Sequence, residues 1–275
     1  MNAKKIEKFY DIQGLFQCPL CNKSMFFENN SIVCGNHHCF DISKKGYINF
    51  IPQQKELKGY DKTFFENRHE IFNMGLYNHI LYGINQILLE KQEAEYVIDA
   101  GCGEGYYAKN LKGMNKIIAL DISKEAIKIS ANGNNNIYWL VADITNLPIR
   151  SNSIDCLLNI FTPANYSEFL RIMKGNGIII KAIPGNSHLI ELRQAVKQYI
   201  HKEAYSNQNV MDSFKKHFKI INHLHLSQTF PITAEQAIKL YQMTPLLFNV
   251  KKSILDTCSI SHITIEAEIL VGKRI

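Results

Sequence analysis

Buried strands and helices alternate between residues 95 and 183, and this alternation restricts the possible folds more than any other feature of the chain. Five continuous apolar runs are typical of strands that are covered on both faces. They span residues 96–100, 116–121, 137–141, 154–160 and 177–183. The pattern predicts an α/β fold with a parallel, doubly wound sheet, whose ligand site lies beyond the carboxyl ends of the strands.

A glycine-rich loop directly follows the first of these strands. Gly101, Gly103 and Gly105 leave room for a sharp turn and for close approach of a ligand to the backbone. Asp121 ends the second strand, at about the spacing where a carboxylate accepts hydrogen bonds from ribose hydroxyls. The loop reads Gly-x-Gly-x-Gly and not Gly-x-Gly-x-x-Gly, so the pattern disfavours a nicotinamide-dependent oxidoreductase, whose dinucleotide needs the longer spacing.

A cluster of cysteine and histidine residues near the start of the chain has the spacing of a metal site. Cys18 and Cys21 form a C-x2-C knuckle, and Cys34 with His38 supplies a second pair. This is the Cys3His set that structural zinc prefers. Free buried thiols, or two disulfides, are the alternative interpretations. Disulfides need an oxidising compartment, and the first residues contain no apolar secretory signal.

His37 and Cys39 stay open as alternative fourth ligands. Whichever residue binds, a closed four-ligand site leaves no coordination position for water, so we interpret the zinc as structural. Such a site can order a segment that is too small for a hydrophobic core of its own. The expected organisation of the 275 residues is a zinc-binding unit at 1–51, a linker with helices at 52–93, and a large domain at 94–275.

Short strands at 25–27 and 46–50 are expected to pack around the zinc knuckle. The polar, lysine-bearing stretch at 52–62 is predicted to be a mobile linker or a loop that faces the substrate. From residue 64 to residue 88, apolar residues recur at three- and four-residue spacings, with an interruption near Gly75. This predicts two helices with a break between them, whose apolar stripe packs in the core.

Charge and hydropathy narrow the function classes. No apolar run approaches eighteen residues, which argues against a membrane span, and the missing secretory signal favours a cytoplasmic location. The net charge of +6 and the pI near 8.8 give a moderate basic bias. Either an ordinary solvated surface or a nucleic-acid partner accounts for this bias.

Several motifs resemble those of a known enzyme family. Residues 99–107 look like the first motif of class I S-adenosylmethionine-dependent methyltransferases. From Cys18 to Lys273 the chain is similar to the bacterial large-subunit rRNA guanine-N1 methyltransferases, which join an N-terminal zinc knuckle to that fold. The other segments that carry the resemblance are 18–21, Cys34, His38, 45–49, Arg68, Gly75, Tyr77, 121–128, 184–192 and 243–245. The first sixteen residues look like an extension outside the family's pattern.

The resemblance implies a Rossmann-like sheet of seven strands, a small N-terminal zinc-binding domain and a site for S-adenosylmethionine. Asp121 would hold the ribose hydroxyls of this donor, and Asp143 with Ile144 would meet its adenine. Asp99 could instead cap the following helix, and Asp143 could sit in a turn. The full set of donor-binding residues implied by the resemblance is Tyr77, Asp99, Gly101, Gly103, Glu104, Gly105, Tyr106, Asp121, Ile122, Asp143, Ile144 and Asn159.

The end of the fourth strand, residues 159–163, would line the acceptor base by the same resemblance. Its sequence, Asn-Ile-Phe-Thr-Pro, departs from the Asn/Asp-Pro-Pro-Tyr pattern of methyltransferases that act on exocyclic amines. This departure favours a ring nitrogen as the acceptor. The expected reaction is transfer of a methyl group from S-adenosylmethionine to N1 of a guanine in a hairpin loop of 23S rRNA.

Guanine N1 carries a proton at neutral pH, so methyl transfer requires that this proton be removed. We predict that Phe161 stacks on the guanine and that Arg68 contacts the phosphate backbone. His188 and Glu191, which follow the fifth strand, are the candidates for the base that removes the proton. His188 could instead make a structural hydrogen bond in a turn.

The zinc unit is expected to present Lys23, Lys44 and Lys45 to RNA and to do no chemistry itself. Two rival interpretations remain. One is a methyltransferase of a small molecule, in which the knuckle serves only stability. The other is a non-catalytic RNA-binding assembly factor with a vestigial donor pocket, and the intact glycines and Asp121 argue against it. The sequence leaves open a homodimer and the choice between neighbouring guanines.

Overall fold

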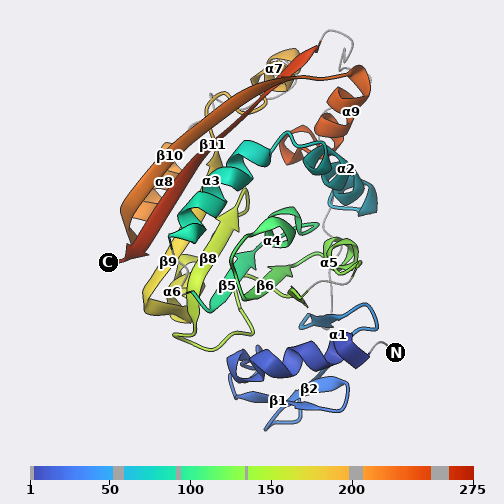
Figure 1. The fold of residues 1–275 in the computed structure, drawn as a ribbon, viewed down its shortest axis with the longest axis vertical. Coiled ribbons are helices and arrows are strands. Elements are labelled where there is room, and N and C mark those ends of the chain that lie inside the picture. Colours follow the sequence, from blue (N-terminus) through green and yellow to red (C-terminus); the bar gives the residue numbers. More distant parts are fainter. Residues whose placement is uncertain (1–2, 52–58, 91–93, 134–135, 198–206, 249–259) are drawn as a thin grey trace.

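The computed structural model describes residues 3–51, 59–90, 94–133, 136–197, 207–248 and 260–275. Helices cover a large twisted sheet, and a small N-terminal unit lies against one end of the molecule (Figure 1). The predicted linker or substrate-facing loop at 52–62 falls mostly outside the described residues. In the described part of the chain, no helix combines the length and the apolar character that a membrane crossing requires.

The large sheet has eight strands in the order β10-β11-β9-β8-β5-β6-β7-β4. The six strands from β4 to β9 run parallel, and β11 and β10 add to this sheet in antiparallel fashion. The parallel α/β sheet is thus confirmed, with one strand more than the seven expected. The strand bounds are β4 Tyr47–Asn49, β5 Tyr96–Ala100, β6 Lys116–Asp121, β7 Tyr138–Val141, β8 Ile154–Ile160, β9 Met173–Pro184, β10 Phe218–Pro231 and β11 His262–Arg274.

The central strands are apolar throughout because both of their faces are covered. Adjacent residues of β5 show this, since Val97 packs in the core beneath the helices that follow Asp61, whereas Ile98 packs in the core beneath the N-terminal segment. The helices of the large domain are α2 Lys62–Asn73, α3 Asn78–Leu89, α4 Tyr106–Asn110, α5 Lys124–Ser130, α6 Tyr166–Ile172, α7 Ile190–Ala195, α8 Gln208–Lys215, α9 Ala234–Gln242 and the 3-10 helix η3 Pro245–Leu247.

The predicted pair of helices with a break near Gly75 is confirmed as α2 and α3. Asp61 caps the start of α2, because its carboxylate accepts a hydrogen bond from the amide of Phe64 at 2.9 Å. Gly75 has φ +87°, a left-handed conformation that glycine adopts without strain. The break turns the chain so that α2 lies over the carboxyl ends of the strands while α3 packs beside β10 (Figure 1).

The N-terminal unit contains a three-stranded antiparallel sheet with the order β1-β2-β3. Its strand at 25–27 was predicted and is confirmed as part of β1. The bounds here are the helix α1 Ala3–Glu7, the 3-10 helix η1 Lys8–Leu15, and the strands β1 Met25–Glu28, β2 Ser31–Cys34 and β3 Cys39–Asp41. Phe9, Ile12 and Phe16 are fully buried against the large sheet, so the segment 6–16 forms part of the core although it looks like an extension in sequence.

The strand expected near Tyr47 is present as β4, which contacts the zinc unit through a bridge between Ile42 and Ile48 and also joins the large sheet. This strand, β4, pairs in parallel with β7, so that Tyr47 lies opposite Trp139 and Ile48 opposite Leu140. Tyr47 and Ile48 are both buried. A strand with consecutive buried residues needs cover on two faces, which the large sheet provides and a small knuckle cannot. The N-terminal unit is therefore tied to the large domain through a shared sheet.

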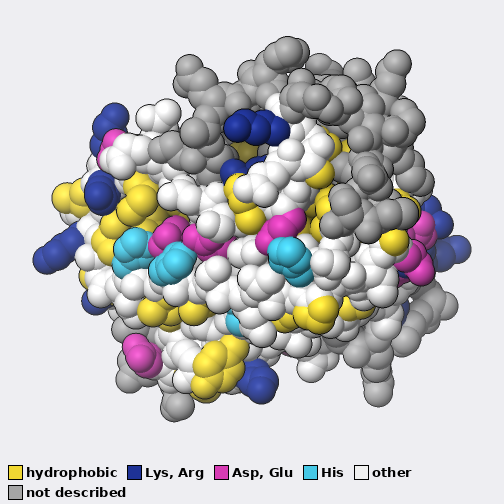
Figure 2. Space-filling view, turned by 90° about the horizontal axis from the view of Figure 1, so that it is seen from above, with side chains coloured by type: hydrophobic (Ala, Val, Ile, Leu, Met, Phe, Trp, Pro, Cys, Tyr) yellow, Lys and Arg dark blue, Asp and Glu magenta, His cyan; other side chains and the backbone are white. Residues whose placement is uncertain are grey.

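The long antiparallel strands β10 and β11 form the outer wall of the molecule, and their exposed face is mostly polar. Figure 2 shows histidine and acidic side chains next to one another on the surface. Across these two strands, His223 pairs with Glu268 and His225 pairs with Glu266, each at 2.7 Å. Apolar residues such as Phe214 fill the space between α8 and β11. Glu266 also accepts a hydrogen bond from the Ser187 amide, in a loop beside the central cavity.

Candidate active site and metal centre

The four predicted zinc ligands come together. The ligand atoms of Cys18, Cys21, Cys34 and His38 all lie within 4.8 Å of one another. Cys34 Sγ is 3.4 Å from His38 Nδ1, and Cys21 Sγ is 3.5 Å from Cys34 Sγ. Tetrahedral zinc with bonds of about 2.3 Å requires ligand atoms roughly 3.8 Å apart, so the set fits this ion.

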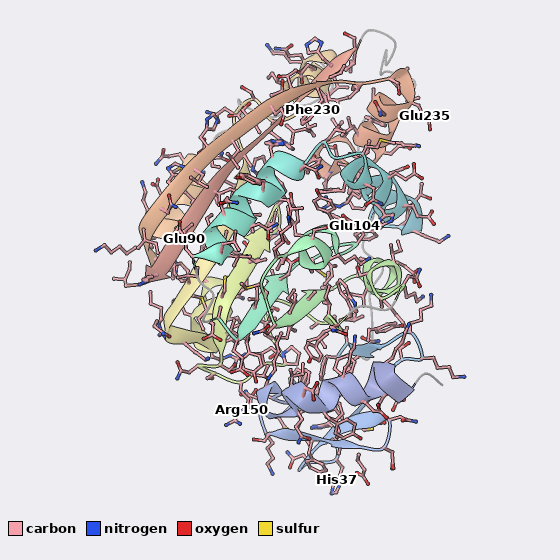
Figure 3. All side chains as sticks on the ribbon, in the orientation of Figure 1. His37, Glu90, Glu104, Arg150, Phe230 and Glu235 are labelled. Carbon is pink, nitrogen blue, oxygen red and sulfur yellow. The ribbon has the colours of Figure 1, made fainter. Side chains whose placement is uncertain are left out.

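The alternative fourth ligands lie outside this set. Cys39 is exposed on β3, and His37 lies at the far tip of the N-terminal unit (Figure 3). His37 has φ +62°, and its amide donates to the carbonyl of Cys34 at 2.8 Å, which closes the turn that brings His38 to the thiolates. With four protein ligands the site has no open position, so zinc there holds the fold together and supplies no catalysis.

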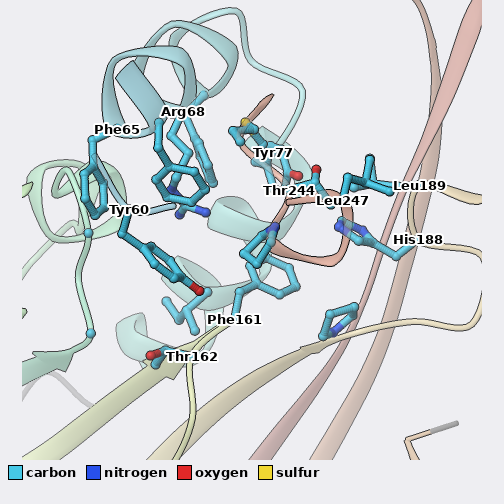
Figure 4. Close-up of a pocket in the computed structure, with 18 of the residues that line it drawn as sticks. Tyr60, Phe65, Arg68, Tyr77, Phe161, Thr162, His188, Leu189, Thr244 and Leu247 are labelled. Carbon is cyan, nitrogen blue, oxygen red and sulfur yellow. The ribbon is translucent and has the colours of Figure 1, made fainter. Parts of the chain in front are cut away.

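A cavity of about 540 Å³ opens at the carboxyl ends of β5, β6 and β8, where the parallel sheet predicts a ligand site. Helix α2 and the segment around η3 form its roof (Figure 4). Aromatic and aliphatic side chains make up most of the lining, with a few polar groups among them, as is typical of small-molecule sites. The lining includes Arg68, Tyr77, Gly101, Gly103, Asp121, Phe161, Thr162, His188 and Arg193.

The glycine loop allows the chain to turn tightly at the edge of the cavity. Gly101 has φ +84°, and a Cβ atom there would lie 2.5 Å from the Thr162 hydroxyl. Gly105 has φ +81°, and a Cβ atom there would lie 2.5 Å from the Trp139 ring. Both positions therefore exclude a side chain for reasons of backbone conformation and of space.

Asp121, at the end of β6, has the position expected of a ribose-binding carboxylate. Its Oδ2 accepts a hydrogen bond from the Gly103 amide at 2.9 Å, and its Oδ1 accepts one from the Ser123 amide at 2.8 Å. These bonds fix the carboxylate while each oxygen keeps a free lone pair. Because Asp121 and its neighbour Ile122 line the cavity, the lone pairs are available to hydroxyl groups of a ligand.

Two further carboxylates are buried behind the glycine loop. Asp99 and Glu104 are each 1% exposed, and within the described residues Asp99 Oδ2 and Glu104 Oε1 have no hydrogen-bond partner. Burial, together with the charges of Asp121 and Glu104, raises the pKa of Asp99 to about 7. The other oxygen of Glu104 accepts a hydrogen bond from Arg68 Nε at 2.9 Å.

This surplus of buried negative charge fits a cationic ligand. S-adenosylmethionine carries a sulfonium and an ammonium group, and its ribose hydroxyls match the free lone pairs of Asp121. The carboxylates of Asp99 and Glu104 would be stabilised by its positive charge. Helix α2 brings the Arg68 guanidinium beside the Glu104 carboxylate and over the Phe72 ring, so Arg68 forms part of the donor side of the cavity.

Buried hydrogen bonds hold the end of β8 and the loop that follows it in place. Asn159 is fully buried, and its side chain donates hydrogen bonds to the carbonyls of Pro163 and Ala100 and accepts one from Lys181. Lys181 is 3% exposed and also donates to the Thr162 carbonyl at 3.3 Å. Burial lowers the pKa of Lys181 to about 8. Asn159 thus shapes the loop at 159–163 and does not face the cavity.

Three rings surround the part of the cavity that is lined by Phe161 and His188. Phe161 has φ +52°, which points its ring into the cavity instead of along the sheet (Figure 4). The ring of His188 stacks on it, with centroids 5.6 Å apart and planes 24° apart, and Tyr77 meets both rings edge-on. An open slot beside stacked aromatic rings is suited to a flat heterocycle.

The remaining predicted residues lie away from the cavity surface. Both carboxylate oxygens of Glu191 accept hydrogen bonds from Thr264, at 2.9 and 2.6 Å, so the structure offers no support for Glu191 as a base. Asp143 binds the amide and hydroxyl of Thr145, which is the turn considered as the alternative, and its contact with adenine stays a prediction. Tyr106 packs in the core and donates from its hydroxyl to Asn78.

Sequence reasoning missed Lys181 and the aromatic roof. Lys181 is the single charge within the apolar run of β9, and this interruption was the signal that could have identified it. Phe64 and Phe65 line the roof and were interpreted as core packing because their spacing on α2 is that of an ordinary buried stripe. Tyr60, which also lines the cavity, lies in the stretch that was predicted to be a linker or a loop facing the substrate. Only the tertiary structure shows that the same stripe also covers a cavity.

Comparison with known proteins identifies both modules of the chain. Residues 16–58 match the zinc-ribbon family described as "RlmA, N-terminal", and residues 98–180 match the family described as "Methyltransferase domain". The first match contains all four zinc ligands, and the second contains the glycine loop, Asp121 and the end of β8. These matches confirm the class I methyltransferase fold and the zinc site.

Two relatives align with this chain over most of their own length. A Bacillus subtilis protein, "Putative 23S rRNA (guanine-N(1)-)-methyltransferase YxjB", is 30% identical over 95% of this chain and 98% of its own length. The "23S rRNA (guanine(748)-N(1))-methyltransferase" of Streptomyces fradiae is 25% identical over 83% of this chain and 84% of its own length. A crystal structure titled "putative s-adenosyl-l-methionine-dependent methyltransferase", from Methanococcus maripaludis, is 24% identical, covers 62% of this chain and 91% of that chain, and has a TM-score of 0.47.

Proposed function

Since the chain belongs to the family of 23S rRNA (guanine-N1)-methyltransferases, we propose that it transfers a methyl group from S-adenosylmethionine to N1 of a guanine in a hairpin loop of 23S rRNA. The chain is an S-adenosylmethionine-dependent methyltransferase, and the proposal concerns its acceptor. The observation that carries it is the match to a relative over 95% of this chain, which includes the zinc ribbon as well as the donor domain.

The geometry of the cavity supports this acceptor. Asp121 and the buried carboxylates would hold the donor beside the glycine loop, and the Phe161 ring offers a stacking surface in the same cavity. A guanine that is flipped out of a hairpin loop can stack against this ring. Placement of N1 in line with the methyl group and the departing sulfur accounts for most of the rate.

We assign the zinc ribbon to RNA recognition. Lys23, Lys44 and Lys45 are exposed on it, and β4 fixes the ribbon rigidly beside β7 of the donor domain. Positive charge on a module of fixed orientation can hold the RNA backbone while a loop base reaches the cavity. K44E/K45E should raise the KM for rRNA and leave donor affinity unchanged, whereas K219E on β10 should change neither.

The test is the identity of the product. We expect purified protein and S-adenosylmethionine, incubated with unmodified 23S rRNA transcribed in vitro, to form 1-methylguanosine, measured by chromatography of the digested RNA. D121A should abolish the product because the donor loses its ribose contact. Formation of 2-methylguanosine instead, or no methylated nucleoside although the donor binds, would overturn the proposal and favour a different base atom or a small-molecule acceptor.

A further inference from the structure

The side chain of His188 is held rigidly at the end of the cavity that faces the acceptor. His188 closes a turn, in which its amide donates to the Gly185 carbonyl at 3.1 Å, and the next amide, of Leu189, donates to Thr264 on β11 at 2.8 Å. A Cβ atom at Gly185 would overlap the Glu266 side chain, so the turn packs directly against β11. The ring that projects from this turn is stacked on Phe161 (Figure 4).

One hydrogen bond defines which ring nitrogen of His188 carries a proton. The backbone amide of Glu266 donates to His188 Nδ1 at 3.2 Å. A backbone N–H can only donate, so Nδ1 must be the unprotonated nitrogen. In the neutral ring the proton is therefore on Nε2, and Nε2 is a donor with no lone pair to accept a proton.

The surroundings of His188 keep the ring neutral. Burial is the largest influence and lowers the pKa of His188 to about 4, and the positive charge of Arg193 acts in the same direction. The carboxylate of Glu266 opposes this, but it is engaged with His225 and with the Ser187 amide. Throughout the neutral pH range His188 is thus an uncharged hydrogen-bond donor.

We propose that His188 is a catalytic residue that donates a hydrogen bond from Nε2 to O6 of the acceptor guanine, in place of the base expected from sequence. Among the described residues, none forms a hydrogen bond with Nε2, and the ring lines the cavity beside Phe161. A guanine stacked in this slot would present its N1 edge to the donor and the adjacent O6 to His188. This inference rests on the proposed function and assigns a role within it.

The donated hydrogen bond promotes the reaction by stabilising the negative charge that develops on the guanine. As the N1 proton leaves to solvent, the electron pair of the N–H bond delocalises over N1 and O6. The hydrogen bond from His188 to O6 becomes stronger as this negative charge develops, as in an oxyanion hole. N1 then forms its bond to the methyl carbon, and the sulfur–methyl bond breaks with its electrons going to sulfur. The products are 1-methylguanine, S-adenosylhomocysteine and one proton.

Two substitutions distinguish a hydrogen-bond donor at position 188 from a general base. H188F keeps the stacked ring but removes both nitrogens, and H188Q keeps an N–H donor but has no basic nitrogen. In single-turnover methylation of unmodified 23S rRNA, we expect H188F to be slower by about 10²-fold and H188Q to recover at least tenfold of that loss. The affinity for S-adenosylmethionine should be unchanged in both variants. H223A, on the outer strand β10, serves as the control and should methylate at the wild-type rate.

A second measurement uses the wild-type enzyme. Replacing O6 by sulfur, a weak acceptor, in a synthetic hairpin with one 6-thioguanosine at the methylated position should slow the wild type but produce no further loss in H188F. An H188F rate equal to the wild type, an H188Q rate equal to that of H188F, or equal sulfur effects in both enzymes would each overturn the donor role. Absence of 1-methylguanosine with the wild type would instead refute the proposed function.

Discussion

The pairing of Arg68 with Glu104 allows a sharp test of how helix α2 is held over the donor cavity. The two side chains meet at 2.9 Å, with Glu104 1% exposed and Arg68 21% exposed. In R68M the Glu104 carboxylate loses its partner while it stays buried, and its Oε1 already lacks a hydrogen bond among the described residues. Breaking a buried pair in this way costs about 3–5 kcal/mol, and the partial exposure of Arg68 places the expected loss at the lower end, about 3 kcal/mol.

Urea unfolding without the donor measures this loss. The chain has a single tryptophan, Trp139, which is buried on β7 beside the glycine loop, so its fluorescence reports on this region. R68M/E104Q should recover most of the stability, because no unpaired buried charge remains. K62M, which breaks the exposed pair with Glu66 on the same helix, should unfold like the wild type. The reasoning would be refuted by an R68M variant as stable as K62M, or by a double variant as unstable as R68M.

Three other predictions concern the donor, the glycine loop and the zinc. The pKa of Asp99 is raised to about 7, so its carboxyl is protonated below that pH and no longer attracts the cationic donor. The dissociation constant for S-adenosylmethionine, measured by calorimetry, should therefore rise about tenfold from pH 8 to pH 6 in the wild type and should not rise in D99N. Gly113 has φ +73°, and an added Cβ would make only an ordinary contact with Leu89 at 3.9 Å, so G113A should cost about 1–2 kcal/mol. G105A should cost about 1–3 kcal/mol more, because Trp139 blocks its Cβ; equal costs in urea unfolding would contradict this. Removing zinc with a chelator should expose residues 17–41 to limited proteolysis, and unchanged cleavage would mean that the ribbon folds without metal.

Local patterns in the sequence were sufficient to predict the central strands, the helix break and the zinc ligands. The apolar runs located the parallel strands, and the interruption at Gly75 located the break between α2 and α3. The zinc set was predictable because ligand spacing within two knuckles is a local property, and the turn geometry at His37 supports the choice of His38 made from the sequence. Asp121 was predictable because its position follows from the end of a strand.

What the sequence could not supply were contacts between distant segments. β4 was expected beside the knuckle, and only the complete fold shows that it also joins the large sheet. The hydrogen bond from Lys181 to Asn159 connects two different strands, β9 and β8. The proposed role of His188 depends on the amide of Glu266, which lies 78 residues away on β11. A histidine that follows a strand is a candidate base from composition alone, and its tautomer becomes evident only when the partner of Nδ1 is known.

The most direct test of the account is a map of reverse-transcription stops on 23S rRNA from cells that lack this gene. Methylation at N1 blocks Watson–Crick pairing, so the account predicts one stop at a hairpin guanine that vanishes in the deletion strain. The wild-type gene should restore the stop, and a gene encoding D121A should not. A stop that persists without the gene, or no guanine whose stop depends on it, would contradict the central claim that this chain methylates guanine N1 in 23S rRNA.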